Sequence, residues 1–218
     1  MKTFKEAIHK FAWFFLPGFL VAAWFYQVAG ILALVCMLAP VVVAFFKGRI
    51  WCGFFCPRGS FNDTLLAQWS RKRPFPGFFT AAWFRSTFLV VLMSAFAIQI
   101  ALAWGNLAAV GMVFWRMIVI TTLITVLLGT FYHQRSWCRI CPMGTLAGYV
   151  ANLRSFRKRI QQVRFQKEKC IDCKICTKSC PVAINVHGFK EFGQVSDSDC
   201  LKCRACIAQC PKQALQLD

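Results

Sequence analysis

The chain has 218 residues, of which 58% are hydrophobic, and it carries 26 Lys and Arg against 8 Asp and Glu. This apolar fraction exceeds that of ordinary soluble domains, and 13 cysteines in a chain of this length do not suit a small disulfide-stabilised scaffold. A net charge of +18 would indicate nucleic-acid binding in a soluble protein. In so apolar a chain it is typical of membrane topology and of contact with anionic lipid, so we expect membrane lipid and no nucleic acid as a partner.

Long stretches of the first 153 residues contain almost no charge. A membrane-spanning helix needs about 20 apolar residues, and the stretch 11–46 is long enough for two short ones with a turn near Gly30. We predict helices over residues 11–28, 29–46 and 83–104, and a fourth that begins near residue 107 or near Arg116 and ends near residue 132. The first has no small-residue cleavage site, which is typical of an uncleaved anchor.

The positive charges predict the orientation of these helices. Lys and Arg gather in the N-terminal segment, in the 47–82 loop and after residue 134, whereas the two opposite loops have none unless Arg116 is counted. The positive-inside rule places both termini and the 47–82 loop in the cytoplasm. We therefore expect a multi-pass protein of a bacterial or archaeal cytoplasmic (inner) membrane, with its cysteine-rich segments on the cytoplasmic side.

Two cysteine loops share the pattern R-x-W-C-x2–3-C-P-x-G-[ST], at residues 49–60 and 135–145. Each follows a pair of predicted helices, so the unit of two spans and a loop is present twice. Because both loops end on the same side, we expect their thiols to meet. Neighbouring arginines should lower the pKa of these thiols, because cations favour the anionic form. The thiols are those of Cys52, Cys56, Cys138 and Cys141.

These four thiols fit three roles: a third iron–sulfur cluster, a redox-active dithiol or copper-handling site, or a structural role. Four thiolates suit iron–sulfur and zinc equally by number. Cys36 lies within the second predicted helix without a partner. A buried free cysteine behaves as a small hydrophobe, so we expect a structural role for it.

The C-terminal segment contains the pattern C-x2-C-x2-C-x3-C-P twice. This is the bacterial iron–sulfur run, in which the fourth cysteine of each run binds the other cluster. Zinc sites usually pair knuckles of two cysteines each, and disulfides are rare in the cytoplasm. We therefore predict two [4Fe–4S] clusters, with short strands over 182–186 and 214–217. The ligands would be Cys170, Cys173, Cys176 and Cys210 for the first cluster, and Cys200, Cys203, Cys206 and Cys180 for the second.

The predicted fold class is membrane α-helical, with four transmembrane helices in two tandem hairpin repeats, followed by a small α+β bacterial 2[4Fe–4S] ferredoxin domain. Residues 1–153 form the membrane domain, 154–169 a basic juxtamembrane linker and 170–218 the ferredoxin domain. The linker mixes cations with apolar residues and suits a helix that lies on anionic lipid.

The four spans, the two cysteine loops and the paired C-terminal runs resemble the membrane polyferredoxins of the NapH, NosR and CcoG type. This resemblance covers nearly the whole chain and implies a quinol-linked electron-transfer component that serves another redox protein, such as a cytochrome, a ferredoxin-like subunit or a reductase. The second loop departs from the family pattern, because Cys138 and Cys141 are separated by two residues instead of three.

The residues themselves indicate chemistry carried by cofactors. No nucleotide-binding loop, Ser-His-Asp set or paired carboxylates are present, and Glu6 and Asp63 are the only acids before residue 168. We expect an electron carrier, as a quinol dehydrogenase component, rather than a stand-alone enzyme. The alternatives are a copper reductase that assists assembly of a respiratory enzyme and a redox-sensing regulator. A quinone headgroup site near the outer face would involve Arg116, Gln27, Gln99 and Asn106.

Overall fold

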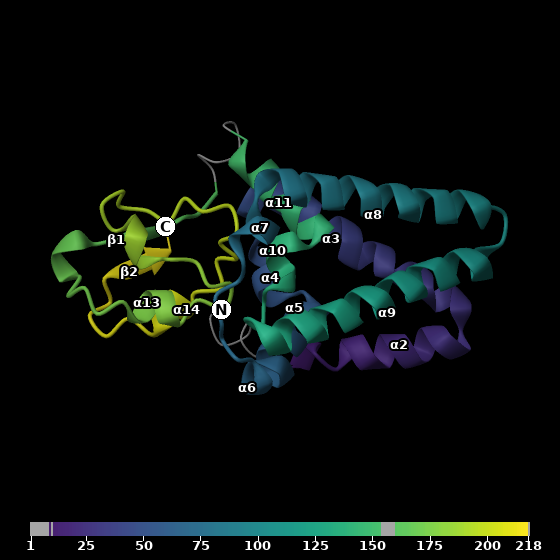
Figure 1. The fold of residues 1–218 in the computed structure, drawn as a ribbon, viewed down its shortest axis with the longest axis horizontal. Coiled ribbons are helices and arrows are strands. Elements are labelled where there is room, and N and C mark those ends of the chain that lie inside the picture. The colour runs from purple at the N-terminus through teal and green to yellow at the C-terminus, as the bar shows by residue number, and fades with distance from the viewer. Residues whose placement is uncertain (1–8, 10, 154–159, 218) are drawn as a thin grey trace.

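The computed structural model describes residues 9, 11–153 and 160–217. Its helices extend to one side of a layer of short helices, and a lobe with a two-stranded sheet lies on the other side (Figure 1). The long helical part consists of α2 (Phe15–Phe25), η1 (Gln27–Leu32), α3 (Ala33–Lys47), α8 (Ala82–Leu102) and α9 (Leu107–Phe131). The short elements of this part are α4 (Ile50–Phe54), α5 (Pro57–Phe61), η2 (Asn62–Leu66), α6 (Ala67–Trp69), α7 (Gly77–Thr80), α10 (Trp137–Ile140) and α11 (Pro142–Asn152).

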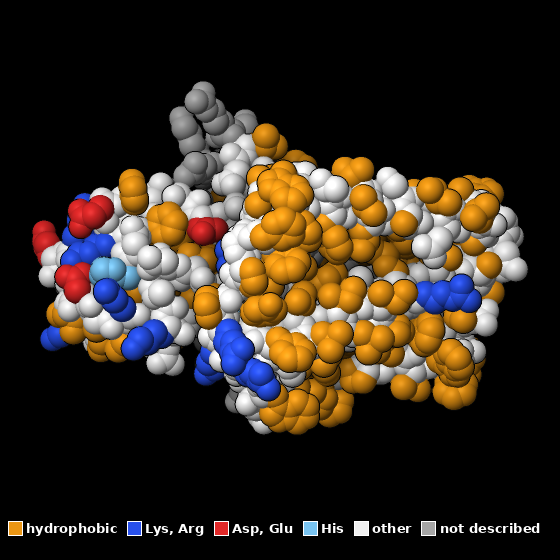
Figure 2. Space-filling view, viewed as in Figure 1, with side chains coloured by type: hydrophobic (Ala, Val, Ile, Leu, Met, Phe, Trp, Pro, Cys, Tyr) orange, Lys and Arg blue, Asp and Glu red, His pale blue; other side chains and the backbone are white. Residues whose placement is uncertain are grey.

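Three described helical stretches are long and apolar enough to cross a membrane: Gln27–Lys47, α8 and α9. The helix predicted over 11–28 is shorter, because α2 has only 11 residues and Gln27 begins the next helical stretch. The outer surface of the bundle is covered with apolar side chains (Figure 2). Phe15, Val90 and Leu123 are each more than half exposed. A surface of this kind requires an apolar environment, and it suggests that the protein is membrane-associated.

Helix α9 begins at Leu107, so Arg116 lies inside the helix and not at its start. Asn106 caps this helix, since its side-chain oxygen accepts hydrogen bonds from the amides of Ala108 and Ala109. Arg116 and Gln99 are exposed on the bundle surface, and neither lines the cavity described below. The outer-face quinone site predicted around Arg116 is thus separate from that cavity and stays a prediction.

The closest packing in the bundle joins η1 to α9. A Cβ atom added at Gly111 would lie 1.9 Å from the carbonyl oxygen of Gln27, and one at Gly30 would lie 2.1 Å from that of Gly111. Only glycine allows two backbones this close, as in small-residue helix crossings in membranes. The turn between the first two helical stretches is thereby held against the start of α9.

The C-terminal lobe contains β1 (Val163–Phe165) paired antiparallel with β2 (Leu215–Leu217), with Arg164 opposite Gln216. Its other elements are η3 (Lys167–Lys169), α13 (Ile175–Lys178), η4 (His187–Phe189) and α14 (Ala205–Ala208). The predicted strand over 214–217 is confirmed by β2. The predicted strand over 182–186 is wrong, because Val182, Ile184 and Val186 are buried in the lobe core without strand pairing.

The expectation of a lipid-bound helix in the basic linker is wrong for Val163–Phe165. Val163 and Phe165 turn into the core of the lobe while Arg164 faces outward, which is the alternation of a half-buried strand. Residues 154–159 of the predicted linker lie outside the described residues.

The tight crossing gives a first testable prediction. Replacing Gly111 with Ala should destabilise the bundle by about 1–3 kcal/mol, because overpacking forces the two backbones apart. The free energy of unfolding in detergent measures the effect. Gly18→Ala in α2 is the matched control, since no atom lies within 4 Å of its added Cβ. Equal unfolding free energies for both variants would contradict the close-packing account.

Candidate iron–sulfur sites

Each cysteine loop is built from a short helix, an extended cysteine and a proline that starts the next helix. Cys56 (φ −70°, ψ 116°) and Cys141 (φ −55°, ψ 126°) precede Pro57 of α5 and Pro142 of α11. Proline disfavours helical backbone in the residue before it and suits the first turn of a helix. The C-P dipeptide thus ends one helix and starts the next. The additional residue of the first loop, Phe55, lies directly after α4.

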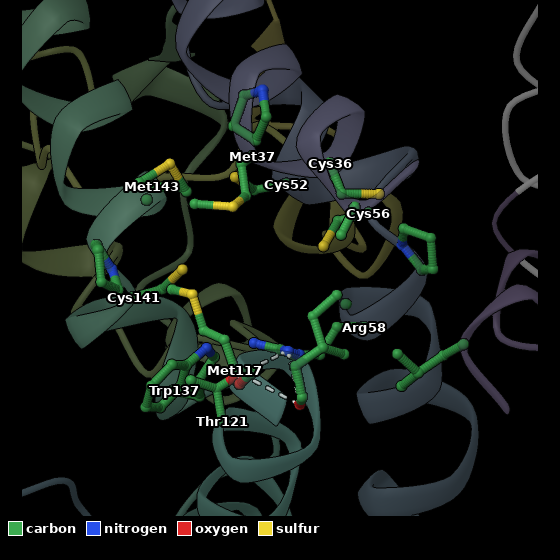
Figure 3. Close-up of a pocket in the computed structure, with 18 of the residues that line it drawn as sticks. Cys36, Met37, Cys52, Cys56, Arg58, Met117, Thr121, Trp137, Cys141 and Met143 are labelled. Atoms are coloured by element: carbon green, nitrogen blue, oxygen red, sulfur yellow. Dashed lines mark hydrogen bonds between the residues drawn. The ribbon is translucent and has the colours of Figure 1, made fainter. Parts of the chain in front are cut away.

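The two loops surround one cavity of about 470 Å³. All four loop thiols, Cys52, Cys56, Cys138 and Cys141, line it, so the expected meeting of the loops is present. Cys36 of α3 also lines this cavity and is not shielded within the bundle core. Figure 3 shows Cys36, Cys52 and Cys56 on one side and Cys141 across from them on the side of Met143, with Met37 and Met117 also around the cavity. The cavity therefore offers more soft sulfur ligands than one four-iron cluster needs.

The arginine of each loop crosses to the other loop. Arg49 donates to the carbonyl oxygen of Cys138 (2.5 Å), and Arg135 donates to that of Cys52 (2.6 Å). The pattern glycines make room for them. A Cβ at Gly144 would lie 2.6 Å from Arg49, and one at Gly59 would lie 3.0 Å from Arg135. The shared pattern thus encodes a reciprocal exchange in which each loop holds the first cysteine of the other.

Each of these buried arginines also pairs with an aspartate. Arg135 binds Asp63 through two nitrogens, at 2.9 and 2.6 Å. Burial raises the pKa of Asp63, but the charge of Arg135 and its hydrogen bonds outweigh this effect and hold the pKa at about 2. This carboxylate therefore stabilises the fold above its ordinary pKa of 3.8, and the contribution is lost as the pH falls through about 2.

Asp199 joins the C-terminal lobe to the membrane part. It is 3% exposed and contacts three arginines: Arg49 at 2.9 Å, Arg85 of α8 at 2.8 Å and Arg139 of α10 at 3.3 Å. Burial raises the pKa of Asp199, but these three guanidinium groups act in the opposite direction and leave it below its ordinary value. A buried carboxylate is stable only with such partners, so the residue before Cys200 fixes where the lobe sits.

The loop thiols do not have the lowered pKa expected from their arginine neighbours. Burial raises the pKa of Cys52 to about 11 and that of Cys138 to about 12, although Arg135 acts in the opposite direction in both cases. The expectation is wrong for these two thiols because desolvation of a thiolate outweighs nearby cations. In the metal-free state they are protonated at neutral pH, and a bound metal would displace the proton.

The C-terminal lobe repeats its backbone every 30 residues. Left-handed conformations occur at Lys174 and Arg204 in the two cysteine runs, and at Ala183 and Gln213 after them. The amide of Ile184 donates to the Cys180 sulfur (3.4 Å), and that of Ala214 donates to the Cys210 sulfur (3.3 Å). Amides directed at cysteine sulfur stabilise the anionic ligands of iron–sulfur clusters and tune their potentials, so this lobe fits such clusters.

The predicted ligands of each cluster gather as the ferredoxin rule requires. One small pocket is lined by Cys170, Cys173, Cys176 and Cys210, the set predicted for the first cluster. For the second set, burial raises the pKa of Cys206, and Cys203, Cys200 and Cys180 act in the same direction, as does Cys176 of the first set.

The second run packs directly against the first cysteine loop. A Cβ at Gly53 would lie 2.6 Å from the Leu201 carbonyl oxygen and 3.5 Å from the Cys203 side chain. Cys52 and Cys138 pack against the core of the lobe. The loops therefore lie against the lobe that carries both cysteine runs.

A fold of apolar helices with a two-run ferredoxin lobe defines an iron–sulfur electron-transfer protein. The chain belongs to the family described as "4Fe-4S binding domain", which matches residues 29–76 and 82–161. These two segments contain the two cysteine loops. The family described as "4Fe-4S dicluster domain" matches residues 162–211, which contain both cysteine runs of the lobe.

Relatives point to the same class. The chain is 28% identical over 201 residues to YccM of Escherichia coli (strain K12), named as a candidate electron transport protein, and the match covers 82% of this chain and 53% of that one. It therefore spans about half the length of this relative. An uncharacterised protein of Methanocaldococcus jannaschii is 23% identical, over 93% of this chain and 82% of its own. One subunit of an ion-translocating oxidoreductase complex from Methanosarcina acetivorans is 43% identical over 49 residues, 22% of this chain and 18% of that one. No solved structure matches the chain.

Sequence reasoning identified the cysteines but not the residues that hold the loops together. Asp63 appeared only as one of two acids before residue 168 and Asp199 was not singled out, because their partners Arg135 and Arg49 lie 72 and 150 positions away. A signal was nevertheless present, since in both loops the arginine lies three residues before the first cysteine and the glycine three residues after the second.

The Asp199 contacts give a second prediction. Asp199→Asn should lower the free energy of unfolding by about 3–5 kcal/mol, because it leaves buried arginines without a counter-charge. Denaturant titration in detergent measures the loss. Glu191→Gln serves as the control, since this carboxylate is 83% exposed and lies 3.8 Å from Lys167; it should change stability by less than about 1 kcal/mol. A loss for Asp199→Asn no larger than the control's would refute the docking role.

Proposed function

We propose that the protein spans a cytoplasmic membrane four times and exchanges electrons between the quinone pool and a redox partner, as a membrane polyferredoxin of the NapH, NosR and CcoG type. The observation that carries this proposal is the position of the loop cysteines, which line a cavity among apolar helices while Cys52 and Cys138 also pack against the lobe that carries the two cysteine runs. A continuous arrangement of this kind suits a path between a lipid-soluble and a water-soluble reactant.

Three [4Fe–4S] clusters would be held by twelve cysteines, four in the loops and eight in the lobe. The first cluster belongs to Cys170, Cys173, Cys176 and Cys210, the second to Cys200, Cys203, Cys206 and Cys180, and the third to Cys52, Cys56, Cys138 and Cys141. When bound, the clusters supply one-electron transfer. The chain spaces the ligands, directs amides at their sulfurs and excludes water from the loop site by burying it between the bundle and the lobe.

The topology follows from the positive charges. Residues 1–153 form the membrane unit, with α2 as a short fourth span and two tandem hairpin units that each end in a cysteine loop. The soluble unit begins within the predicted linker, at β1. Both termini and all cysteine sites then lie in the cytoplasm, as the distribution of Lys and Arg indicates.

The cavity has the character of a quinone site. Its wall is mostly apolar, with Phe15, Leu32 and Phe114 among the lining residues. Arg58 reaches into it from α5 and donates to the hydroxyl of Thr121 at 2.8 Å (Figure 3). The Trp137 indole N–H is buried in the same wall without a hydrogen-bond partner among the described residues. A buried donor without a partner is costly, and a quinone carbonyl oxygen is an acceptor that would satisfy it.

Reoxidation by quinone tests the relay. Protein reduced with dithionite and then desalted should lose its cluster EPR signals when decylubiquinone is added in detergent. In Cys138→Ser the ferredoxin signals should persist at least about tenfold longer, because the proposed path loses its middle site. Reduced wild-type protein that quinone leaves unchanged would overturn the quinone link. Equal rates in wild type and Cys138→Ser would overturn the role of the loop site.

Substitution of Arg58 tests the quinone position. Arg58→Met should raise the apparent KM for decylubiquinone by about tenfold, because a hydrogen bond to a charged donor contributes about 1.5–3 kcal/mol. The EPR spectra of the clusters should stay unchanged. Arg116→Met, which removes an exposed cation outside the cavity, is the matched control. A larger effect of Arg116→Met would move the site to the opposite end of the bundle.

A second candidate function is copper reduction during assembly of a respiratory enzyme. It is favoured by the three methionines that line the cavity beside five thiols, since soft thiolate and thioether ligands select Cu(I). Replacing Met37, Met117 and Met143 together with Leu separates the two functions. If the triple variant loses Cu(I) binding but is still reoxidised by quinone, the methionines belong to a copper site. If the wild type binds no Cu(I) and the triple variant is reoxidised more slowly, this candidate is excluded.

A further inference from the structure

The two cysteine runs present equivalent faces that have different surroundings. Positions 30 residues apart correspond throughout the lobe, as the paired left-handed residues show. Ile171 thus corresponds to Leu201, and Cys173 to Cys203. Leu201 is 1% exposed, whereas Ile171 is 58% exposed. The same local structure is therefore covered in one run and bare in the other.

The covered face is the one that docks onto the membrane part. The Leu201 carbonyl and the Cys203 side chain abut Gly53 of the first loop. Asp199, directly before this run, is received by Arg49, Arg85 and Arg139. The covered face thus consists of an apolar residue, a predicted cluster ligand and an acidic residue, and it binds a basic surface of the membrane part.

The bare face has the same apolar elements but the opposite charge. Ile171 and Ile175 are exposed on either side of Cys173, which is exposed as well. The position of Asp199 is taken by Lys169, and Lys174 and Lys212 line the same pocket. These three lysines are exposed and form no ion pair with any described residue. The one acidic side chain inside this run, Asp172, is already bound by Lys190 and His187.

We propose that the face formed by Lys169, Ile171, Cys173, Lys174 and Lys212 docks an acidic soluble redox protein, as the Asp199 face docks the basic loops of the membrane part. The proposal rests on the proposed relay and names the chemistry of its partner. A cluster held by Cys170, Cys173, Cys176 and Cys210 would supply one-electron transfer here, and the loss of one electron by the cluster or the partner would be matched by its gain by the other. Exposed lysines around an exposed ligand would also steer such a partner to the surface where the distance is shortest.

Binding of an acidic flavodoxin to the holoprotein in detergent tests this face. Lys169→Gln/Lys174→Gln should weaken the Kd about tenfold at low salt and reduce its dependence on ionic strength. Lys72→Gln/Arg73→Gln removes the same charge from an exposed segment of the membrane part and should leave the Kd unchanged. Ile171→Ser should weaken binding without changing its salt dependence. Basic cytochrome c should bind weakly to all variants.

The outcomes separate this proposal from the relay itself. EPR of each variant reports whether the clusters are intact, and decylubiquinone reoxidation reports the relay. Equal loss of flavodoxin binding in both double variants would overturn the docking face and assign the effect to net charge. A shift of cluster potential in Lys169→Gln/Lys174→Gln without a change in Kd would also overturn it. If quinone does not reoxidise the reduced wild-type protein although flavodoxin binds to it, the relay is refuted and the docking face is retained.

Discussion

Two buried arginines hold the two cysteine loops and the ferredoxin lobe in one arrangement. Arg49, which is 2% exposed, bonds to the backbone of the second loop and to Asp199 of the lobe. Arg135 bonds to the backbone of the first loop and to Asp63. Burying a guanidinium is costly unless it is paired with a counter-charge, so each arginine depends on its aspartate. The position of the four loop thiols relative to the lobe depends on them.

This arrangement changes the meaning of the net charge of +18. Not all of these cations are surface groups that reflect the orientation in the membrane. Arg49, Arg85 and Arg135 are buried between the loops and the lobe. Their number exceeds that of the two aspartates they share. A four-iron cluster with four thiolates carries about −2, so the excess positive charge at this junction suits an anionic site. Burial at this junction also raises the pKa of the Cys52 and Cys138 thiols in the metal-free protein. Their deprotonation therefore requires a bound metal.

The sequence predicted the parts whose chemistry is local. Cysteine spacing identified the two ferredoxin runs, and long apolar stretches identified α8 almost to its ends and the C-terminal end of α9, whose start was left open between residue 107 and Arg116. The parts that failed depend on distant contacts. The strand in the basic linker exists because Val163 pairs with Leu217. The segment 182–186 forms no strand, because its apolar side chains pack into the core of the lobe and not against a sheet.

The candidate site shows the same division. The loop pattern predicted that four thiols meet, but not that Arg49 and Arg135 exchange between loops, since nothing local indicates which carbonyl a guanidinium will reach. Cys36 was expected to be structural because periodicity alone does not reveal a cavity beside its helix. The cavity arises from packing of α2, α3 and α9 against the loops, which no single segment encodes.

The central claim is that the loop thiols bind a cluster in line with the two of the ferredoxin lobe. Iron and acid-labile sulfide content of the anaerobically purified full chain, read together with Mössbauer spectra, tests it most directly. Three cubane clusters predict about twelve irons and twelve sulfides per chain, all in [4Fe–4S] environments. About eight of each, with the loop cysteines still open to alkylation, would contradict the claim.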